Sequence, residues 1–292
     1  MRVLVLGADG MAGHVVLRHL AARHEAFGST RSVEPTALYT AEISPANIKT
    51  GLDARDFDQF RLAIQLIQPE AVINCIGIVK QRTSDNIAML EVNSLFPHRL
   101  ALLCSEVGSR LIHLSTDCVF SGRRGLYTEA DLPDPSDFYG VSKLAGEVTP
   151  VPALTLRTSI IGLELVRRTS LIEWSLRQTI SAPGYTKAIF SGLTTQELAR
   201  LLDLILVSQP DLTGLWHVAS TPISKYHLLG HFYDQLGRTV TLVPSDEVDC
   251  DRSLDGSRFS HRTGYVAPSW SQMLAELALE VHERERLYDV GR

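Results

Sequence analysis

The sequence predicts an α/β protein built on a Rossmann-type, doubly wound parallel sheet, with a smaller C-terminal α/β lobe. Short apolar runs, each as long as a buried parallel strand, alternate with segments of helical spacing up to about residue 160. A glycine-rich turn joins the first apolar run to the first helical segment. After Gly162 the regular alternation ends and shorter elements follow. We therefore assign residues 1–162 to the Rossmann domain, with later segments returning to it, and residues 163–292 mainly to the smaller lobe.

Length and composition limit the class of protein. The chain has 292 residues, of which 45% are hydrophobic, and a net charge of −5, which suits one large α/β domain with a smaller lobe. Lysine and arginine are dispersed, so we expect no nucleic-acid partner. No apolar run approaches the roughly 18 residues of a membrane span, and Gly7 comes too early for a signal peptide. We therefore expect a cytoplasmic protein with no membrane partner. The cysteines show no C-x-x-C spacing, which favours free thiols and no metal site.

The first strand, turn and helix indicate a nucleotide cofactor. Val3–Leu6 fits a buried strand, and Val15–Ala22 has helical spacing. Between them, Gly7 permits a tight turn, Gly10 lets the backbone approach a pyrophosphate, and Gly13 lets the helix pack against the strand. The phosphate would lie at the helix N-terminus, among unpaired N–H groups. The spacing is G-x-x-G-x-x-G rather than G-x-G-x-x-G, and the alternative is a purely structural turn.

The end of the second strand predicts which dinucleotide is bound. Ala26–Thr30 is the expected strand, and an acidic residue at its end would bind the ribose of NAD. The sequence has Ser29-Thr30-Arg31-Ser32 instead. A guanidinium with small hydroxyls suits a 2′-phosphate. We therefore expect NADPH, with NADH as the less favoured cofactor. The alternative is that Arg31 is a solvated loop residue.

Two further segments are expected beside the cofactor. Asp53 precedes the helix Phe57–Ile67, and its carboxylate could accept a hydrogen bond from the adenine amine or cap that helix, two roles that are compatible. The strand Ala71–Cys75 ends beside the expected cofactor site. A long helix, Met89–Val107, comes next, with Gly108 just after it.

Asn93 lies inside this helix, where asparagine has poor propensity. Its side chain could turn inward toward Lys143 or could cap a local break at Pro97. The sequence leaves these two interpretations open.

The central strand and the following helix carry the candidate chemistry. Leu111–Leu114 fits a buried strand that delivers Ser115 and Thr116 at its C-terminal end. Tyr139 and Lys143 are four residues apart at the start of the helix Tyr139–Val148, so they share one face. A nearby ammonium favours the phenolate, and a hydroxyl can hold a substrate carbonyl in line. The spacing alone is weak evidence, because a solvent-facing helix start matches it equally well.

The rest of the chain supplies a long polar loop and the elements of the smaller lobe. The loop Ser121–Asp137 is rich in glycine, proline and aspartate, and loops of this length tend to be functional. In the helix Thr194–Val207, Thr194 or Thr195 is the expected N-cap, with Glu197 as a capping-box partner of Thr194. The other expected elements are the strands Thr155–Arg157, Leu215–Ala219 and Val240–Val243, a loop and short strand in Ala182–Phe190, and the helices Leu171–Ile180, Lys225–Leu236 and Ser271–Glu283.

Four motifs in order resemble one known family. They are Gly7/Gly10/Gly13, Ser115-Thr116-Asp117-x-Val119-Phe120-Ser121-Gly122, Tyr139-x-x-x-Lys143 with Gly146-Glu147, and Leu156-Arg157-Thr158. The set resembles the extended short-chain dehydrogenase/reductases over nearly the whole chain. More narrowly, it resembles their dTDP-4-dehydrorhamnose reductase branch.

The resemblance implies a reductase that acts on a nucleotide-linked ketosugar. It makes Tyr139 the acid/base, with Lys143 lowering its pKa and binding the nicotinamide ribose, and Thr116 polarising the carbonyl. The implied NADP-binding residues are Gly7, Gly10, Met11, Ala12, Gly13, Thr30, Arg31, Asp53, Ala54, Cys75, Ile76, Gly77 and Asn93, with Tyr139 and Lys143. The implied substrate-binding residues are Asp117, Cys118, Trp174, Lys187 and Arg252. Either Lys187 or Arg252 would supply the cation for the substrate's diphosphate.

One position departs from the family pattern. Cys118 stands where the branch commonly has tyrosine. Cysteine is smaller and cannot donate the same hydrogen bond, so a different sugar pocket is expected. A 4-keto or other keto-deoxysugar on UDP or dTDP is therefore at least as good a candidate as dTDP-4-dehydrorhamnose.

Three functions stay open at this point. The first is an NADPH-dependent reductase in surface polysaccharide or deoxysugar biosynthesis. The second is a nucleotide-sugar epimerase or dehydratase of the same superfamily. The third is a non-catalytic NADP-binding regulatory subunit, because the branch also contains regulatory partners of methionine adenosyltransferase. A homodimer is compatible with each of them.

Overall fold

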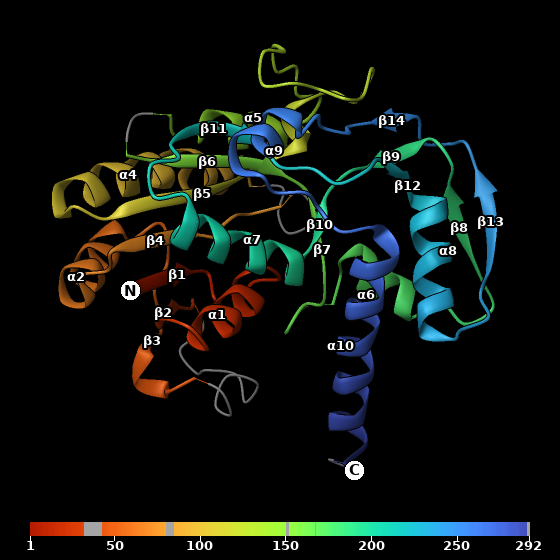
Figure 1. Cartoon of the computed structure of the whole chain (residues 1–292), viewed down its shortest axis with the longest axis horizontal. Coiled ribbons are helices and arrows are strands. Elements are labelled where there is room, and N and C mark those ends of the chain that lie inside the picture. Colours follow the sequence, from red (N-terminus) through yellow and green to blue (C-terminus); the bar gives the residue numbers. More distant parts are fainter. Residues whose placement is uncertain (32–42, 80–84, 150–151, 167, 291–292) are drawn as a thin grey trace.

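A seven-stranded parallel sheet forms the centre of the molecule (Figure 1). The computed structural model describes residues 1–31, 43–79, 85–149, 152–166 and 168–290. The sheet order is β11-β6-β5-β4-β1-β2-β3, and each neighbouring pair is parallel. In chain order the strands are β1 (Arg2–Leu6), β2 (Glu25–Ser29), β3 (Ile48–Lys49), β4 (Ala71–Asn74), β5 (Arg110–Thr116), β6 (Leu154–Thr158) and β11 (Gly214–His217). The predicted fold class is confirmed.

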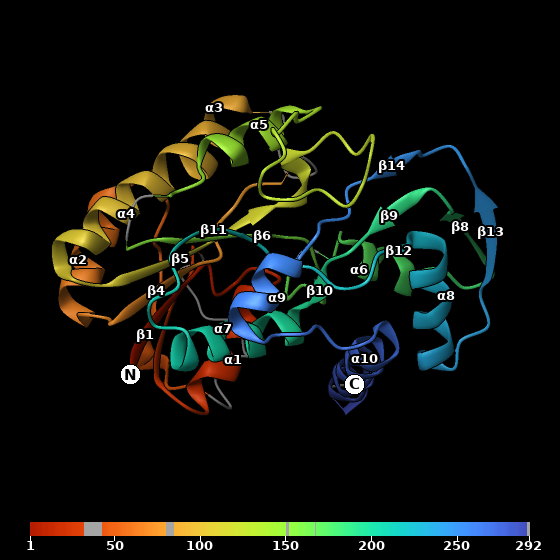
Figure 2. The ribbon, with the colours of Figure 1, turned by 45° about the horizontal axis from the view of Figure 1, so that its top comes forward.

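Alternate residues of β1 show how helices cover both faces of the sheet. Val3 and Val5 belong to one apolar cluster with residues of α1 (Gly13–Ala21) and α7 (Thr195–Ser208). Leu4 and Leu6 belong to a second cluster, on the other face. That cluster includes residues of α2 (Phe57–Ile67) and α4 (Phe96–Val107). Figure 2 shows the two helical layers on opposite sides of the sheet. The strand β1 is therefore apolar throughout because both of its faces are buried.

The order of the sheet fixes where a ligand can bind. From β1 the chain builds β2 and β3 on one side, then crosses to β4 on the other side. The crevice outside the carboxyl ends of β1 and β4 is therefore a topological switch point, which is where open α/β sheets bind ligands.

The expected helix Met89–Val107 is longer and contains a π turn. It begins as α3 (Asn86–Met89), whose N-cap Asp85 accepts from the backbone N of Ile87 and of Ala88. It continues through the π-helical η2 (Leu90–Leu95) into α4. The chain ends this helix at Gly108 with a φ of 73°, as predicted. Pro97 lies in the first turn of α4 and does not interrupt the helix, because Leu95 and Phe96 keep helical dihedrals.

The smaller lobe contains short sheets covered by helices. Its strand pairs are β8 (Ser181–Tyr185) with β13 (Thr241–Ser245), β7 (Ile160–Ile161) with β10 (Leu193–Thr194), and β9 (Ala188–Phe190) with both β12 (Ile223–Ser224) and β14 (Cys250–Asp251). Its helices are α6 (Leu171–Leu176), α8 (Lys225–Leu236) and α10 (Trp270–Val290). The helix α9 (Ser257–Thr263) instead packs on β11 at the edge of the main sheet, where Phe259 contacts Trp216. Both α7 and β11 come after residue 162 but pack on the main sheet. The division at residue 162 stays a prediction.

Two predicted helices end earlier than expected. The helix α5 (Phe138–Ala145) stops before Val148, because the Thr155 hydroxyl binds both the backbone N and the carbonyl O of Val148. The helix α6 ends at Leu176 instead of Ile180, whose carbonyl accepts from the backbone N of Thr241 as β8 and β13 begin to pair. No helix within the described ranges is long and apolar enough to cross a membrane.

Candidate functional site

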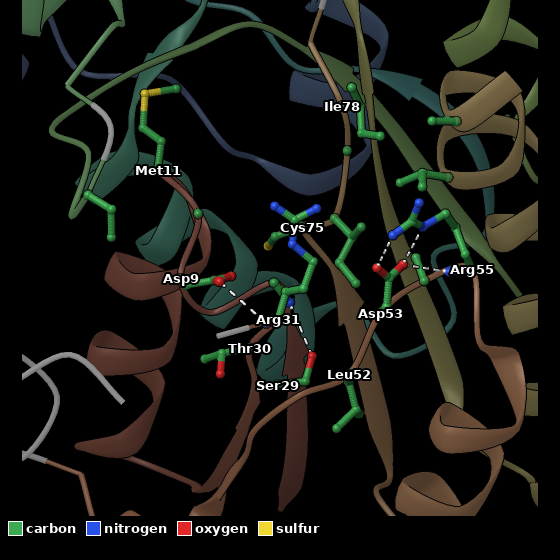
Figure 3. A pocket seen from close by; sticks show the side chains of 18 of the residues that line it. Asp9, Met11, Ser29, Thr30, Arg31, Leu52, Asp53, Arg55, Cys75 and Ile78 are labelled. Atoms are coloured by element: carbon green, nitrogen blue, oxygen red, sulfur yellow. Dashed lines mark hydrogen bonds and ion pairs between the residues drawn. The ribbon is translucent and has the colours of Figure 1, made fainter. Parts of the chain in front are cut away.

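A cavity of about 430 Å³ lies at the predicted switch point (Figure 3). Ten of the residues expected to bind cofactor line it: Gly7, Gly10, Met11, Thr30, Arg31, Asp53, Ala54, Cys75, Ile76 and Gly77. Ser29, one of the small hydroxyls expected near a 2′-phosphate, lines it as well. Sequence analysis missed the remaining lining residues: Asp9, Leu52, Arg55, Ile78, Asp85, Ala88, Val92 and Glu164–Val166. The crevice that the sheet order predicts is therefore a real cavity with the expected glycine turn in its wall.

The glycine turn has the geometry that its spacing implies. Gly7 has a φ of 76°, which favours glycine, and Gly10 N donates to Gly7 O at 2.9 Å. A Cβ on Gly13 would lie 2.1 Å from Gly7 O, so only glycine lets α1 start so close to the turn. Ala12 and Gly13 are not part of the cavity lining. They are buried and pack behind the turn that forms the cavity wall.

His14 supports the same turn from below. Its Nδ1 lies 2.9 Å from Gly10 O, and the side chain is buried. Burial lowers the pKa of His14 to about 4, so the ring is neutral at physiological pH and its Nδ1–H can donate to that carbonyl. The ring therefore holds the Gly10 peptide in place without adding charge near the cavity.

Asp53 lines the cavity but does not cap the following helix. The N-cap position of α2 is Asp56. The Asp53 carboxylate instead accepts three hydrogen bonds from Arg55: from the backbone N at 3.0 Å, from Nε at 3.0 Å and from an NH2 nitrogen at 2.6 Å. These bonds lower the pKa of Asp53 to about 2, so it stays ionised. The predicted capping role is wrong, because the local turn directs the carboxylate to Arg55.

Asn93 holds the opposite wall of the cavity. Its Oδ1 accepts from Ile78 N at 2.8 Å, and its Nδ2 donates to Ile78 O at 2.8 Å and to the Ser142 hydroxyl at 3.0 Å. The side chain thus turns inward, as one interpretation held, but it binds Ser142 and not Lys143. It is not part of the cavity lining.

The three candidate catalytic side chains meet between β5 and α5. Thr116 and Lys143 are buried and Tyr139 is half-buried, and the Tyr139 phenol lies within interaction reach of the Thr116 hydroxyl, which itself accepts from Cys118 N at 3.1 Å. The Lys143 ammonium donates to Leu114 O at 2.7 Å. None of the three lines the cavity, but Cys75, which does, lies within electrostatic reach of Lys143. The structure therefore places this group directly beside the cavity.

The expected lowering of the Tyr139 pKa by Lys143 is not seen. Burial raises the pKa of Tyr139 above its usual value, and Cys118 and Asp117 raise it further, while the Thr116 hydrogen bond opposes them. Burial also lowers the pKa of Lys143 to about 8, although Glu147 favours its charged form. Removal from water is therefore the largest influence on both pKa values, and the charge of Lys143 is not among the main influences on Tyr139.

A second polar group lies beyond Thr116, where the sugar was expected. The Arg252 guanidinium donates to Phe120 O at 2.9 Å, contacts Cys118 Sγ at 3.5 Å and donates to the Ser136 hydroxyl at 3.0 Å. The carboxylate of Asp117 accepts from the Thr116 hydroxyl at 3.2 Å, and burial raises the pKa of Asp117. Arg252 thus joins β14 to the Ser121–Asp137 loop beside the candidate catalytic side chains.

The other two predicted substrate-binding residues, Lys187 and Trp174, do not contact Arg252 or Asp117. Lys187 is exposed and pairs with Asp246 at 3.4 Å. Trp174 is half-buried in α6, and within the described ranges no hydrogen bond or ring contact joins its side chain to Arg252 or Asp117. Of the two cations proposed for the diphosphate, the structure therefore places only Arg252 beside Cys118.

Comparisons with known proteins agree with this geometry. The family model described as "RmlD substrate binding domain" matches residues 1–165. The probable low-salt glycan biosynthesis reductase Agl14 of Haloferax volcanii is 30% identical over 306 residues, which cover 95% of this chain and 97% of that protein. Methionine adenosyltransferase 2 subunit beta of Danio rerio is 35% identical over 152 residues, which cover 50% of this chain and 42% of that protein.

A solved structure shares the fold over almost the whole length. The dTDP-4-dehydrorhamnose reductase of Bacillus anthracis, solved in complex with NADP, gives a TM-score of 0.80 at 20% identity, over 96% of this chain and 99% of that chain. The family match covers more than half of the chain, and the similarity to Agl14 extends over nearly all of it. The chain therefore belongs to the RmlD substrate-binding-domain family, the dTDP-4-dehydrorhamnose reductase-like group of the extended short-chain dehydrogenase/reductases.

Proposed function

We propose that the protein is an NADPH-dependent reductase of a nucleotide-linked keto-deoxysugar. The observation that carries the proposal is that Thr116, Tyr139 and Lys143 lie together beside a cavity with a glycine turn in its wall. Relatives described as reductases, one of them a dTDP-4-dehydrorhamnose reductase solved with NADP, support the same class.

The residues of the cavity fit a dinucleotide. The turn at Gly7–Gly13 keeps side chains away from the place of a pyrophosphate, and Arg31 offers a cation at the end of β2. When bound, NADPH supplies the hydride for reduction of a carbonyl carbon.

Tyr139 is the group that we assign as the acid in such a reduction. Its raised pKa keeps the phenol protonated at neutral pH, so it can deliver a proton to the developing alkoxide oxygen. The hydroxyl of Thr116 lies against that phenol and can donate to the same oxygen. The cation of Lys143 is fixed by the Leu114 carbonyl and stabilises negative charge that develops nearby. Asp117 and Arg252 are placed to contact the sugar and its diphosphate.

A panel of UDP- and dTDP-linked ketosugars tests the proposal by loss of NADPH absorbance. We expect turnover with a 4-keto-deoxysugar and at least a 10²-fold lower rate in Tyr139→Phe, from the loss of an acid catalyst. The matched control is Tyr233→Phe, which removes a phenol of α8 that donates to Ser175 O in α6. Equal activity in Tyr139→Phe and the control would exclude the assigned acid.

A second candidate is a non-catalytic regulatory subunit, which the similarity to the subunit beta of methionine adenosyltransferase 2 favours. It predicts dinucleotide binding without turnover of any ketosugar and stable co-purification with a methionine adenosyltransferase. Turnover that depends on Tyr139 excludes it. An epimerase or dehydratase would instead retain its cofactor through purification and consume none.

A further inference from the structure

Two arginines line the adenosine end of the cavity in different states (Figure 3). The guanidinium of Arg55 is engaged by Asp53 through two donors. The side chain of Arg31 makes no hydrogen bond or ion pair with any residue the structure describes, and only its backbone N donates, to Asp9 at 3.3 Å. The Arg55 guanidinium is therefore already paired with Asp53, whereas the Arg31 guanidinium can pair with a bound ligand.

The Asp53–Arg55 side-chain pair forms within one local turn of the backbone. The two residues are two positions apart, and Asp53 Oδ1 also accepts from Arg55 N, which turns the chain so that the two side chains meet. Asp56 N donates to Asp53 O at 2.9 Å and closes the same turn. The pair is half-exposed and needs no distant element to form.

The available arginine lies within electrostatic reach of the same carboxylate. The charge of Arg31 favours the ionised form of Asp53. Without Arg55, Asp53 would be an unpaired anion within electrostatic reach of that guanidinium. Asp9 and Asp85 also line the cavity, and Asp85 and Glu91 face Arg55. A 2′-phosphate with a charge near −2 would therefore enter a region that already contains several carboxylates.

We propose that Arg55 determines specificity for a 2′-phosphorylated adenosine by occupying Asp53, which leaves Arg31 for the phosphate. This inference rests on the proposed NADPH-dependent function. Arg55 acts through Asp53 and Arg31 in this scheme and does not itself contact the phosphate.

Binding of 2′,5′-ADP and 5′-AMP by calorimetry tests the inference without catalysis. The two probes differ only in the 2′-phosphate, so contacts to adenine and to the 5′-phosphate cancel in the ratio of their dissociation constants. We expect the wild type to prefer 2′,5′-ADP. We expect Arg55→Gln to reduce this preference about tenfold, which corresponds to the loss of roughly one ion pair. Arg99→Gln, on the exposed face of α4, is the matched control and should leave it unchanged.

The double variant Asp53→Asn/Arg55→Gln decides the mechanism. It removes the competing carboxylate as well, so the preference for 2′,5′-ADP should return to within about twofold of the wild type. If the double variant stays as weak as Arg55→Gln, Arg55 binds the phosphate directly and the inference is overturned. An unchanged preference in a folded Arg55→Gln, checked by circular dichroism, also overturns it.

The same titrations separate this inference from the proposed function. If the wild type binds neither probe nor NADPH, the proposed reductase fails. If it binds both probes equally, or if it prefers the probe that lacks the 2′-phosphate, the inference about Arg55 and the preference for NADPH over NADH both fail, but a dinucleotide-dependent reductase does not.

Discussion

The carboxylate of Glu147 receives two hydrogen bonds from Arg157, one from Nε at 2.7 Å and one from an NH2 nitrogen at 2.7 Å. Both side chains are almost completely buried, at 7% and 4% exposure. The Ser115 hydroxyl adds a third bond to Glu147, and His217 lies 3.2 Å from the Arg157 guanidinium. This pair joins the segment just after α5 to β6, within electrostatic reach of Lys143.

Glu147→Gln should lower the free energy of unfolding by about 3–5 kcal/mol, because it leaves the Arg157 cation buried without its partner. Glu106→Gln is the matched control: its pair with Arg61 is exposed and should contribute at most about 1 kcal/mol. Urea unfolding measures both values. Equal losses in the two variants would show that the buried pair contributes no more to stability than the exposed pair.

Lys143 should make stability depend on pH in a defined direction. Its folded pKa of about 8 is below its usual value of 10.5. Between about pH 8 and 10 the folded state has released the proton while the unfolded state keeps it, so stability from this group rises with pH. From pH 8 to 10 the stability of the wild type relative to Lys143→Met should rise by about 2 kcal/mol.

Urea unfolding at several pH values checks this prediction. The other groups that titrate in this range are common to both proteins, so the difference between the two reports mainly on Lys143. A difference that stays constant from pH 8 to 10 would show that Lys143 keeps its charge in the folded state.

Gly13→Ala should destabilise the protein and abolish dinucleotide binding, because the new Cβ would lie 2.1 Å from Gly7 O and displace the turn. The expected stability loss is about 1–3 kcal/mol. Gly108→Ala is the control: Gly108 has a φ of 73° but open space around it, so the loss should be about 1 kcal/mol with binding kept. Thermal unfolding and NADPH titration distinguish the two variants.

Arg252→Gln should raise the KM for the nucleotide-sugar at least tenfold, because the guanidinium beside Cys118 is lost. NADPH binding should not change, since Arg252 does not line the dinucleotide cavity. Lys187→Gln, which removes an exposed cation paired with Asp246, should leave both values unchanged. A rise in KM in Lys187→Gln, with no change in Arg252→Gln, would show that Lys187 binds the diphosphate.

The strands and the glycine turn could be predicted because their signals are local. A continuous apolar run predicts a strand that is buried on both faces. The spacing of Gly7, Gly10 and Gly13 is set by the conformation of the turn alone, so it can be recognised without knowledge of the rest of the fold. The start of α2 at Phe57 was predicted correctly, but its cap was not. Asp53 and Asp56 are both suitable residues, and only the turn conformation decides which one faces the helix.

The properties of the candidate catalytic side chains could not be derived from spacing alone. The four-residue spacing of Tyr139 and Lys143 predicts a shared helix face but not the burial that sets both pKa values, because burial depends on packing against β5 and the neighbouring loop. The Glu147–Arg157 pair joins two elements whose contact depends on the whole sheet. The partner of Asp53, only two residues away, was missed because no periodicity marks it.

The π turn at Leu90–Leu95 makes the cavity wall and α5 mechanically dependent on each other. Asn93 binds the peptide of Ile78 on one side and Ser142, the neighbour of Lys143, on the other. Removing one residue to restore regular helical winding would rotate the following side chains by about 100° and carry this amide out of reach of both. A deletion here would therefore disturb the cavity wall and the packing of α5 together, although neither segment is itself altered.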